Sequence, residues 1–320
     1  MGPRRTVAES MEPRWTAAEI PDQSGRGALV TGANSGLGLA TARALSDAGA
    51  RVLLASRDKR RGERARALIL GGDVRVVELD LADLGSVRAC ASSLHDELEQ
   101  LDLLILNAGV MAPPRRLTRD GFESQIGTNH LGHFALTGLL LNLLLAAPAA
   151  RVVTVSSGAH RIGKIDFDDL HGERSYGAWR AYGQSKLANL MFCFELQRRA
   201  VAAGAELKSV AAHPGYAATN LQFAGPSRFH ERAVMALTNK LIAQSAEMGA
   251  LPTLFAATVC ELPGGTFIGP DGFMEERGYP HVVTAASKAY DEGAWRRLWE
   301  VSSELTGVRY DFGVTAAPAG

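Results

Sequence analysis

The sequence predicts an α/β fold: a single doubly wound (Rossmann) domain with a parallel sheet of about seven strands and helices on both faces. Short apolar, β-branched runs alternate along the chain with longer helical segments, and a glycine-rich turn follows the first such run. No internal repeat, low-complexity tract or Pro/Ser-rich linker marks a second domain. Because right-handed crossovers between parallel strands must cover the sheet, this alternation places helices on both faces.

The first half of the chain supplies four strands and three helices. The run at 101–106 is almost wholly apolar, which is typical of a strand buried on both faces. The helix at 58–70 is strongly charged, and the helix at 84–98 is amphipathic. In order, we expect a strand at 28–31, a helix at 36–48, a strand at 51–55, a helix at 58–70, a strand at 74–79, a helix at 84–98 and a strand at 101–106.

The second half begins with a long helix and is less regular beyond residue 216. We expect a helix at 122–145, a strand at 151–155, a helix at 179–201, a strand at 206–212 and a seventh strand at 265–269. As units, we expect a loose N-terminal arm at 1–25, the doubly wound domain at 26–312 and a tail at 313–320. The stretch 216–246 carries scattered apolar residues and is interpreted either as a lid over a substrate pocket or as a helix packed on the domain.

The composition argues against nucleic acids and membranes as binding partners. The chain has 320 residues, with 34 basic and 34 acidic side chains and no formal net charge. A neutral balance gives no electrostatic reason to expect a nucleic acid or an anionic membrane as a partner. The longest apolar stretch, 136–150, is interrupted and shorter than the roughly 20 residues of a membrane span. We therefore expect no stable membrane attachment.

The cysteines and the N-terminus predict a cytoplasmic protein. Cys90, Cys193 and Cys260 are odd in number and far apart, so they predict no disulfide framework. No apolar segment follows Arg4 and Arg5, so no secretion signal is expected. Either Met1 or Met11 can be the start of the protein.

A glycine-rich turn lies between the first strand and the first helix, where such a motif favours dinucleotide binding over an ordinary turn. Gly32 permits a tight turn, Gly36 lets a pyrophosphate approach the backbone, and Gly38 allows the helix to pack on the strand. The N-terminus of the helix then offers free N–H groups and a positive dipole end to the phosphates.

The spacing of these glycines, G-x-x-x-G-x-G, resembles that of the short-chain dehydrogenase/reductase superfamily. Four further segments are similar to motifs of that family: Leu106-Asn107-Ala108-Gly109 after strand four, Ser156-Ser157 after strand five, Tyr182-x-x-x-Lys186, and His213-Pro214-Gly215 after strand six. The resemblance covers about residues 27–273. It implies an enzyme that interconverts a carbonyl and an alcohol with a nicotinamide cofactor, acting on a small molecule.

The pair Tyr182 and Lys186 carries the predicted chemistry. Residues at i and i+4 share one face of a helix. A nearby ammonium is expected to lower the pKa of the phenol from about 10 toward working pH, so that Tyr182 acts as general acid and base. The alternative is an exposed tyrosine beside a solvated lysine.

Two more residues complete the catalytic set that the resemblance implies. Ser157 aligns with the family's catalytic serine and would orient the substrate oxygen, whereas Ser156 would face away and be structural. Asn129 resembles the asparagine that holds a water in a proton relay through the lysine; the alternative is an asparagine that bonds a helix carbonyl. His130 and His133 lack a third ligand, so we expect no metal and interpret them as packing or polar-network residues.

Cofactor choice depends on the end of the second strand, where an NAD enzyme usually carries a carboxylate. Arg57 stands there instead, followed by Asp58, which we expect to cap the next helix. Arg57 can grip a 2′-phosphate, so NADP(H) is predicted in preference to NAD(H), which stays an alternative. The predicted cofactor-binding residues are Gly32, Ser35, Gly36, Leu37, Gly38, Arg57, Asp80, Leu81, Asn107, Ala108, Gly109, Tyr182, Lys186, Pro214, Gly215 and Thr219.

Within the superfamily the chain resembles the branch of retinol dehydrogenases, WW-domain oxidoreductase and protochlorophyllide reductase. The matching segments lie at 15–21, 129–134, 165–170 and 298–305. Apolar residues of the segment 216–246 suggest a hydrophobic substrate, and Trp179 either lines its pocket or covers the core. Two other classes are alternatives. One is a catalytically silent dinucleotide-binding sensor or scaffold. The other is a nucleotide-sugar epimerase or dehydratase, which usually carries a longer substrate domain and the spacing T-G-x-x-G-x-x-G, neither of which is present here. The apolar segment 139–145 leaves a monomer and a homodimer open.

Overall fold

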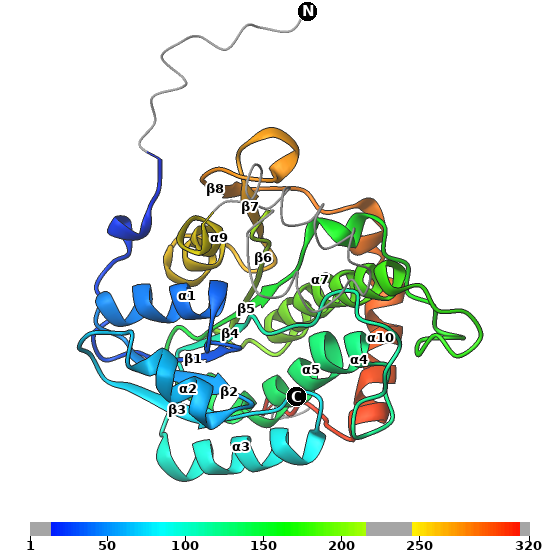
Figure 1. Cartoon of the computed structure of the whole chain (residues 1–320), viewed down its shortest axis with the longest axis horizontal. Coiled ribbons are helices and arrows are strands. Elements are labelled where there is room, and N and C mark those ends of the chain that lie inside the picture. The colour runs from blue at the N-terminus through cyan, green and yellow to red at the C-terminus, as the bar shows by residue number, and fades with distance from the viewer. Residues whose placement is uncertain (1–13, 216–244, 314–320) are drawn as a thin grey trace, which may run out of the picture.

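A single twisted sheet forms the centre of the molecule (Figure 1). The computed structural model describes residues 14–215 and 245–313. Within them the strands follow the order β3-β2-β1-β4-β5-β6-β7-β8. Their bounds are β1 (Gly27–Thr31), β2 (Arg51–Ser56), β3 (Val74–Glu78), β4 (Leu103–Leu106), β5 (Arg151–Val155), β6 (Lys208–Ala212), β7 (Phe267–Pro270) and β8 (Pro280–Val282). The order reverses between β1 and β4, which creates the crevice where open α/β sheets bind ligands.

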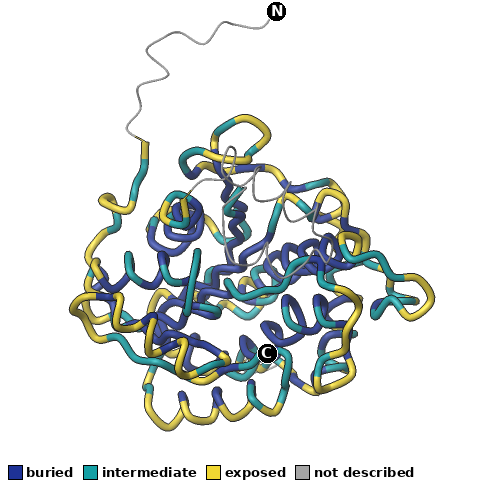
Figure 2. Tube along the Cα trace, in the orientation of Figure 1, coloured by how far each residue is buried: buried dark blue, intermediate teal, exposed yellow. Residues whose placement is uncertain are grey.

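Helices cover both faces of this sheet, as the alternation predicts. The helices α1 (Gly36–Asp47), α2 (Lys59–Arg66) and α9 (Ala246–Thr258) pack on one face, where Leu54, Ile105 and Val210 belong to their core. The opposite face carries α3 (Leu84–Glu97), α5 (Gly132–Leu139), α6 (Leu141–Ala146) and α7 (Ala178–Ala202), with α10 (Glu292–Thr306) packed outside α7. The buried strands therefore run through the middle of the molecule, under an exposed rim of helix faces and loops (Figure 2).

The sheet has one strand more than expected. The strands from β3 to β7 are parallel, but β8 pairs antiparallel with β7, with Ile268 opposite Val282. The sequence of β8 is not typical of a strand, because the element has only three residues, begins with a proline and leaves two residues exposed. The helix α9 was not expected either; it contains Pro252, a residue that normally argues against a helix interior.

The prediction of one long helix at 122–145 is wrong, because this segment forms several shorter elements. It consists of a short turn α4 (Ser124–Ile126), a π-helical turn over Gly127–Leu131, and then α5 and α6, which are separated at Leu140. The stretch 139–145 lies largely within the core of its own subunit, since Leu140, Leu141 and Leu144 are buried there. Periodicity could not show the π-helical turn, in which the side chain of Asn129 bonds to Val110.

The expectation of a loose N-terminal arm is wrong for residues 14–25. The ring of Trp15 packs edge-on against Phe255 of α9, with ring centres 5.3 Å apart. Gln23 is buried and its backbone N–H donates to the carbonyl of Ala48 at 2.8 Å. This segment therefore covers part of the face that carries α1 and α9.

Two of the predicted units fall mostly outside the described residues: the lid at 216–246 and the tail at 313–320. Among the helices that the structure describes, none is both long and apolar enough to cross a bilayer.

Candidate active site

The glycine turn between β1 and α1 has a backbone that side chains would block. Gly32 and Gly36 adopt left-handed φ values of +66° and +55°, which non-glycine residues rarely accept. A Cβ on Gly38 would lie 2.5 Å from the carbonyl oxygen of Gly32 and 2.6 Å from Nδ2 of Asn107. The turn therefore requires glycine at these positions. Ser35 precedes α1 without a side-chain capping bond, so the first N–H groups are available to an anion.

Thr31 joins this turn to the end of β4. Its Oγ1 accepts hydrogen bonds from the backbone N–H groups of Asn107 and Ala108, both at 2.9 Å, and its carbonyl accepts one from Nδ2 of Asn107 at 2.8 Å. Oγ1 also lies 2.9 Å from Nε2 of His133. The predicted motif Asn107-Ala108-Gly109 is thus fastened to the glycine turn across the crevice.

His133 links that turn to Asn129. Its Nδ1 lies 3.0 Å from the carbonyl of Asn129, so Nδ1–H donates there and Nε2 accepts from the hydroxyl of Thr31. Burial lowers the pKa of His133 to about 4, which keeps the ring neutral. His130 faces another way, with Nε2 on Oγ of Ser302 at 2.8 Å. No cluster that could hold a metal occurs in the described part of the chain.

Asn129 lies in the π-helical turn, and its side chain bonds outside its own helix. Oδ1 accepts from the N–H of Val110 at 2.7 Å, and Nδ2 donates to the Val110 carbonyl and to Oγ of Ser185, both at 2.9 Å. These bonds hold the loop after β4 against α7. A Cβ on Gly109 would lie 3.1 Å from Oδ1 of Asn129 and 3.6 Å from Nζ of Lys186, so these three residues meet.

Tyr182 and Ser157 come together across the start of α7. Tyr182 is 5 % exposed, and its phenol interacts with Ser157, which lies two residues after the end of β5. Oγ of Ser156 points elsewhere and donates to the carbonyl of Lys186 at 2.8 Å. The structure therefore brings the second serine of the pair, and not the first, into contact with the phenol.

Lys186 lies behind the tyrosine ring, not against its hydroxyl. Its Nζ donates to the carbonyl of Val155 at 3.1 Å and lies 5.8 Å from the centre of the Tyr182 ring. The side chain is 3 % exposed, and burial lowers the pKa of Lys186 to about 8. The backbone of α7 thus places the two residues on one face, as their spacing predicts.

The expectation that Lys186 lowers the pKa of Tyr182 is wrong. Burial raises the pKa of Tyr182 to about 12, and the hydrogen bond with Ser157 opposes it only in part. Desolvation penalises the phenolate more than the ammonium of Lys186 stabilises it, because Nζ does not touch the hydroxyl. At neutral pH the phenol is therefore protonated, which is the form that a general acid needs.

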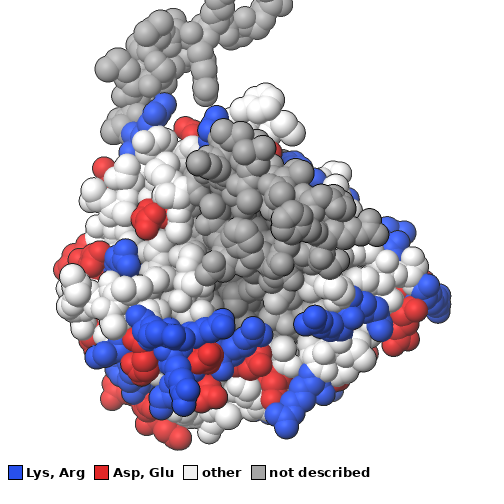
Figure 3. Space-filling view, in the orientation of Figure 1, with Lys and Arg blue, Asp and Glu red and all other residues white. Residues whose placement is uncertain are grey.

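The nucleotide end of the crevice is basic. Arg57 follows β2 with an exposed side chain, and Asp58 caps α2 by accepting from the N–H of Arg61 at 3.1 Å, as expected. Lys and Arg side chains of α2 gather at the lower left of Figure 3, where Figure 1 places this helix. Asp80 accepts from the N–H of Ala82 at 3.0 Å, and Leu81 beside it is buried against the glycine at position 132.

The remaining predicted cofactor residues lie at the ends of strands or outside the described chain. Pro214 and Gly215 follow β6, with Gly215 at φ +64°. Ser35 directly precedes α1, and Leu37 belongs to its first turn. Thr219 falls in the part of the chain that the structure does not describe.

These residues fit a dinucleotide. The glycine cradle, the uncapped helix N-terminus and the basic end of β2 line one edge of the sheet, where the strands β1, β2 and β4 end. Gly32, Gly36 and Gly38 would hold the pyrophosphate, and Asn107, Ala108 and Gly109 would line the path toward Tyr182.

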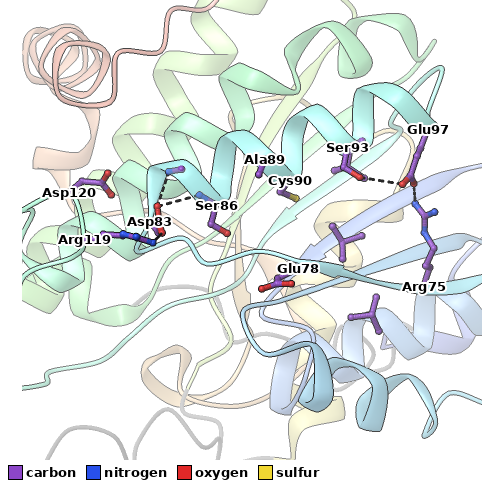
Figure 4. Close-up of a pocket in the computed structure, with 14 residues that line it drawn as sticks. Arg75, Glu78, Asp83, Ser86, Ala89, Cys90, Ser93, Glu97, Arg119 and Asp120 are labelled. Atoms are coloured by element: carbon purple, nitrogen blue, oxygen red, sulfur yellow. Dashed lines mark hydrogen bonds and ion pairs between the residues drawn. The ribbon is translucent and has the colours of Figure 1, made fainter.

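A separate hollow of about 890 Å³ lies at the opposite side of the sheet from β8, between β3 and α3. The ion pairs Arg75–Glu97 and Asp83–Arg119 border it (Figure 4). It shares no lining residue with the site of Tyr182, so the chemistry does not take place there.

The fold and the site together define a class: an α/β oxidoreductase that binds a nicotinamide dinucleotide at the switch point of its sheet. Comparison with known proteins gives the family. The family profile described as short chain dehydrogenase matches residues 26–225. The chain belongs to the short-chain dehydrogenase/reductase family, as an NAD(P)-dependent enzyme that interconverts alcohols and carbonyls in its retinol-dehydrogenase-like branch.

Individual relatives support that placement. The chain is 40 % identical to human retinol dehydrogenase 13 over 300 residues, covering 91 % of this chain and 86 % of the relative. It is 40 % identical to the polyprenol dehydrogenase of Mus musculus over 299 residues, covering 90 % and 86 %. A crystal structure of an uncharacterised protein from Mycobacterium paratuberculosis is 47 % identical, with a TM-score of 0.79 over 93 % of this chain and 100 % of that one.

Proposed function

We propose that this protein is an NADP(H)-dependent carbonyl reductase or alcohol dehydrogenase for a hydrophobic substrate, with Tyr182 as general acid and base. One observation carries the proposal: the buried phenol of Tyr182 lies close enough to Ser157 to interact with it, while Lys186 and Asn129 both lie beside Gly109. Four residues from three distant segments thus converge at the end of the predicted dinucleotide crevice. A protein that only bound the cofactor would have no use for this arrangement.

The chain's own residues handle the proton. The dinucleotide, when bound, supplies the hydride to the carbonyl carbon or takes it from the alcohol. Ser157 donates a hydrogen bond to the substrate oxygen and orients it, and Tyr182 gives its phenolic proton to that oxygen or removes it in reverse. Lys186 and Asn129 connect the phenol to the proton relay that the family resemblance implies.

The choice of NADP(H) rests on charge. Arg57 is exposed at the end of β2, and α2 behind it carries Lys59, Arg60 and Arg61 among its basic residues. A planar guanidinium can bind a 2′-phosphate through two hydrogen bonds, whereas the 2′-hydroxyl of NAD(H) is usually held by a carboxylate.

The hydrophobic substrate rests on two observations. Trp179, which is 53 % exposed, packs edge-on against the Tyr182 ring with ring centres 6.0 Å apart, so an apolar side chain borders the phenol. The relatives named above are a retinol dehydrogenase and a polyprenol dehydrogenase, whose named substrates are long apolar alcohols. The cytoplasm as location, the absence of nucleic-acid and membrane partners, and a monomer or homodimer stay predictions from the sequence.

The first test is calorimetric titration of the purified protein with NADPH and NADH at matched salt. We expect NADPH to bind at least tenfold more tightly, a difference of about 1.4 kcal/mol. Equal binding of NADPH and NADH would contradict the preference for NADP(H) but not the oxidoreductase function. Binding of neither dinucleotide would contradict the proposed function as a whole.

The second test is Tyr182→Phe, assayed with a panel of hydrophobic aldehydes that includes retinoid and polyprenyl aldehydes. We expect turnover to fall by about a thousandfold, because general acid catalysis contributes on the order of 10²–10⁴, while the Kd for NADPH changes less than twofold. Tyr176→Phe is the control, since its hydroxyl bonds Pro113 and Glu123 instead. Unchanged turnover in Tyr182→Phe would favour the silent sensor or scaffold.

A further inference from the structure

Glu275 joins two parts of the site that lie far apart in the sequence. It stands in the loop between β7 and β8, and its Oε2 lies 3.0 Å from Nε2 of His213, the residue before Pro214 and Gly215. Its Oε1 accepts a hydrogen bond from Nη2 of Arg161 at 2.8 Å. Arg161 belongs to the short helical turn that Ser157 begins. One carboxylate therefore contacts both the predicted cofactor loop and the segment that carries the serine.

The hydrogen bonds assign the proton on His213. The backbone N–H of Gly215 donates to Nδ1 at 3.3 Å, so Nδ1 carries no hydrogen and Nε2–H donates to Glu275. The ring is 2 % exposed and packs against Phe267, with ring centres 5.2 Å apart. A Cβ on Gly269 would collide with Nε2, so the neighbouring strand leaves room for this ring. Glu275 thus selects the tautomer that lets His213 accept from the cofactor loop.

The backbone around Glu275 is strained. Met274 and Glu275 have φ values of +54° and +58°, a region that residues with a Cβ rarely enter. Such strain persists only where surrounding contacts over-determine the conformation, and it gathers at functional sites. The loops are also in close contact, since a Cβ on Gly215 would collide with the carbonyl of Glu276. The side-chain bonds to His213 and Arg161 add to backbone hydrogen bonds within the loop, such as that from the N–H of Glu275 to the carbonyl of Gly272 at 2.9 Å.

We propose that Glu275 is a positioning residue that sets the Pro214–Gly215 loop for the dinucleotide by fixing the tautomer of His213. The inference rests on the proposed function, because the loop matters only if a dinucleotide binds beside it. The hydrogen bond with His213 lowers the pKa of Glu275 below its usual range, and Arg161 lowers it further. The carboxylate is therefore ionised at neutral pH. The bonds of Arg161 and His213 together explain why an acidic residue occupies a strained position.

The experiment measures the Kd for NADPH by calorimetry, with kcat and Tm, in Glu275→Ala, Glu275→Gln and the control Glu276→Ala, whose side chain is exposed. We expect Glu275→Ala to weaken NADPH binding about tenfold, or about 1.4 kcal/mol, with kcat at saturating NADPH within threefold. Glu275→Gln keeps an oxygen acceptor for Nε2–H and should restore binding to within threefold. Glu276→Ala should stay within twofold of the wild type.

The outcomes separate the two proposals. If the wild type binds neither NADPH nor NADH, the proposed function fails before any variant is compared. If the wild type binds NADPH and folded Glu275→Ala binds it within twofold, the role of Glu275 is wrong. A glutamine variant as weak as the alanine variant would also overturn it. Should Glu275→Ala not fold, Glu275→Asp decides, because its shorter side chain keeps the charge but withdraws from His213: unchanged binding would overturn the inference, and weakened binding would support it.

Discussion

The glycine turn after β1 and the catalytic centre at α7 differ in what holds them. The turn is a backbone structure, in which Gly32 and Gly38 are needed because no Cβ fits. The catalytic centre is a set of buried polar side chains, whose bonds come from distant segments such as Val110 and Val155. Substitutions in the turn should therefore act through steric collision, and substitutions in the centre through desolvation and lost hydrogen bonds.

The largest effect on cofactor binding is expected from a substitution in the glycine turn. Gly38→Ala places a methyl group against the carbonyl of Gly32, which is backbone and cannot swing away. We expect the Kd for NADPH to rise at least about a hundredfold, or about 2.7 kcal/mol, measured by calorimetry. Gly27→Ala, at the start of β1, is the control, because its Cβ would meet only the Asp102 carboxylate at 3.9 Å. Retained NADPH binding in Gly38→Ala would mean that this turn does not hold the pyrophosphate.

The next largest effect is expected from Lys186→Met in the catalytic centre. In contrast to a substitution in the glycine turn, removing this catalytic side chain should stabilise the protein. Burial lowers the pKa of Lys186 from 10.5 to about 8, which corresponds to about 3 kcal/mol of destabilisation at neutral pH. Lys186→Met removes that cost and loses one hydrogen bond, worth about 1 kcal/mol. We expect a free energy of unfolding higher by about 2 kcal/mol at pH 7, with turnover lost.

The pH dependence of that gain has a definite sign. Between about pH 8 and 10.5 the unfolded wild type binds a proton at Lys186 that the folded wild type has released, so wild-type stability rises with pH. The advantage of Lys186→Met should therefore shrink between pH 7 and pH 9.5 in urea unfolding. Lys164→Met, at an exposed position, should show no such change. A gap that stays constant with pH would contradict burial of a charged Lys186.

The smallest expected effect tests the basic end of the crevice. Arg57→Ala should weaken NADPH binding about tenfold, or about 1.4 kcal/mol, and leave NADH binding within twofold, because only NADPH carries the 2′-phosphate. The measurement is a pair of calorimetric titrations, with Arg296→Ala on α10 as the control. Equal losses for both dinucleotides would show that Arg57 acts on the fold and not on the phosphate.

The sequence by itself determined the fold class, the glycine turn and the spacing of Tyr182 and Lys186. These features are local: strand and helix periods, a glycine spacing and an i, i+4 pair are all set by neighbours in the chain. The capping of α2 by Asp58 is local in the same sense.

Tertiary structure decided what depends on distant contacts. In the π-helical turn the side chain of Asn129 bonds to Val110, 19 residues earlier, and the short strand β8 pairs with the edge of β7. The pKa of Tyr182 rises instead of falling because burial depends on everything packed around the phenol. Glu275 reaches His213 and Arg161 across 62 and 114 residues of sequence. No spacing rule covers such distances, since only the packed sheet brings the ends of its strands together.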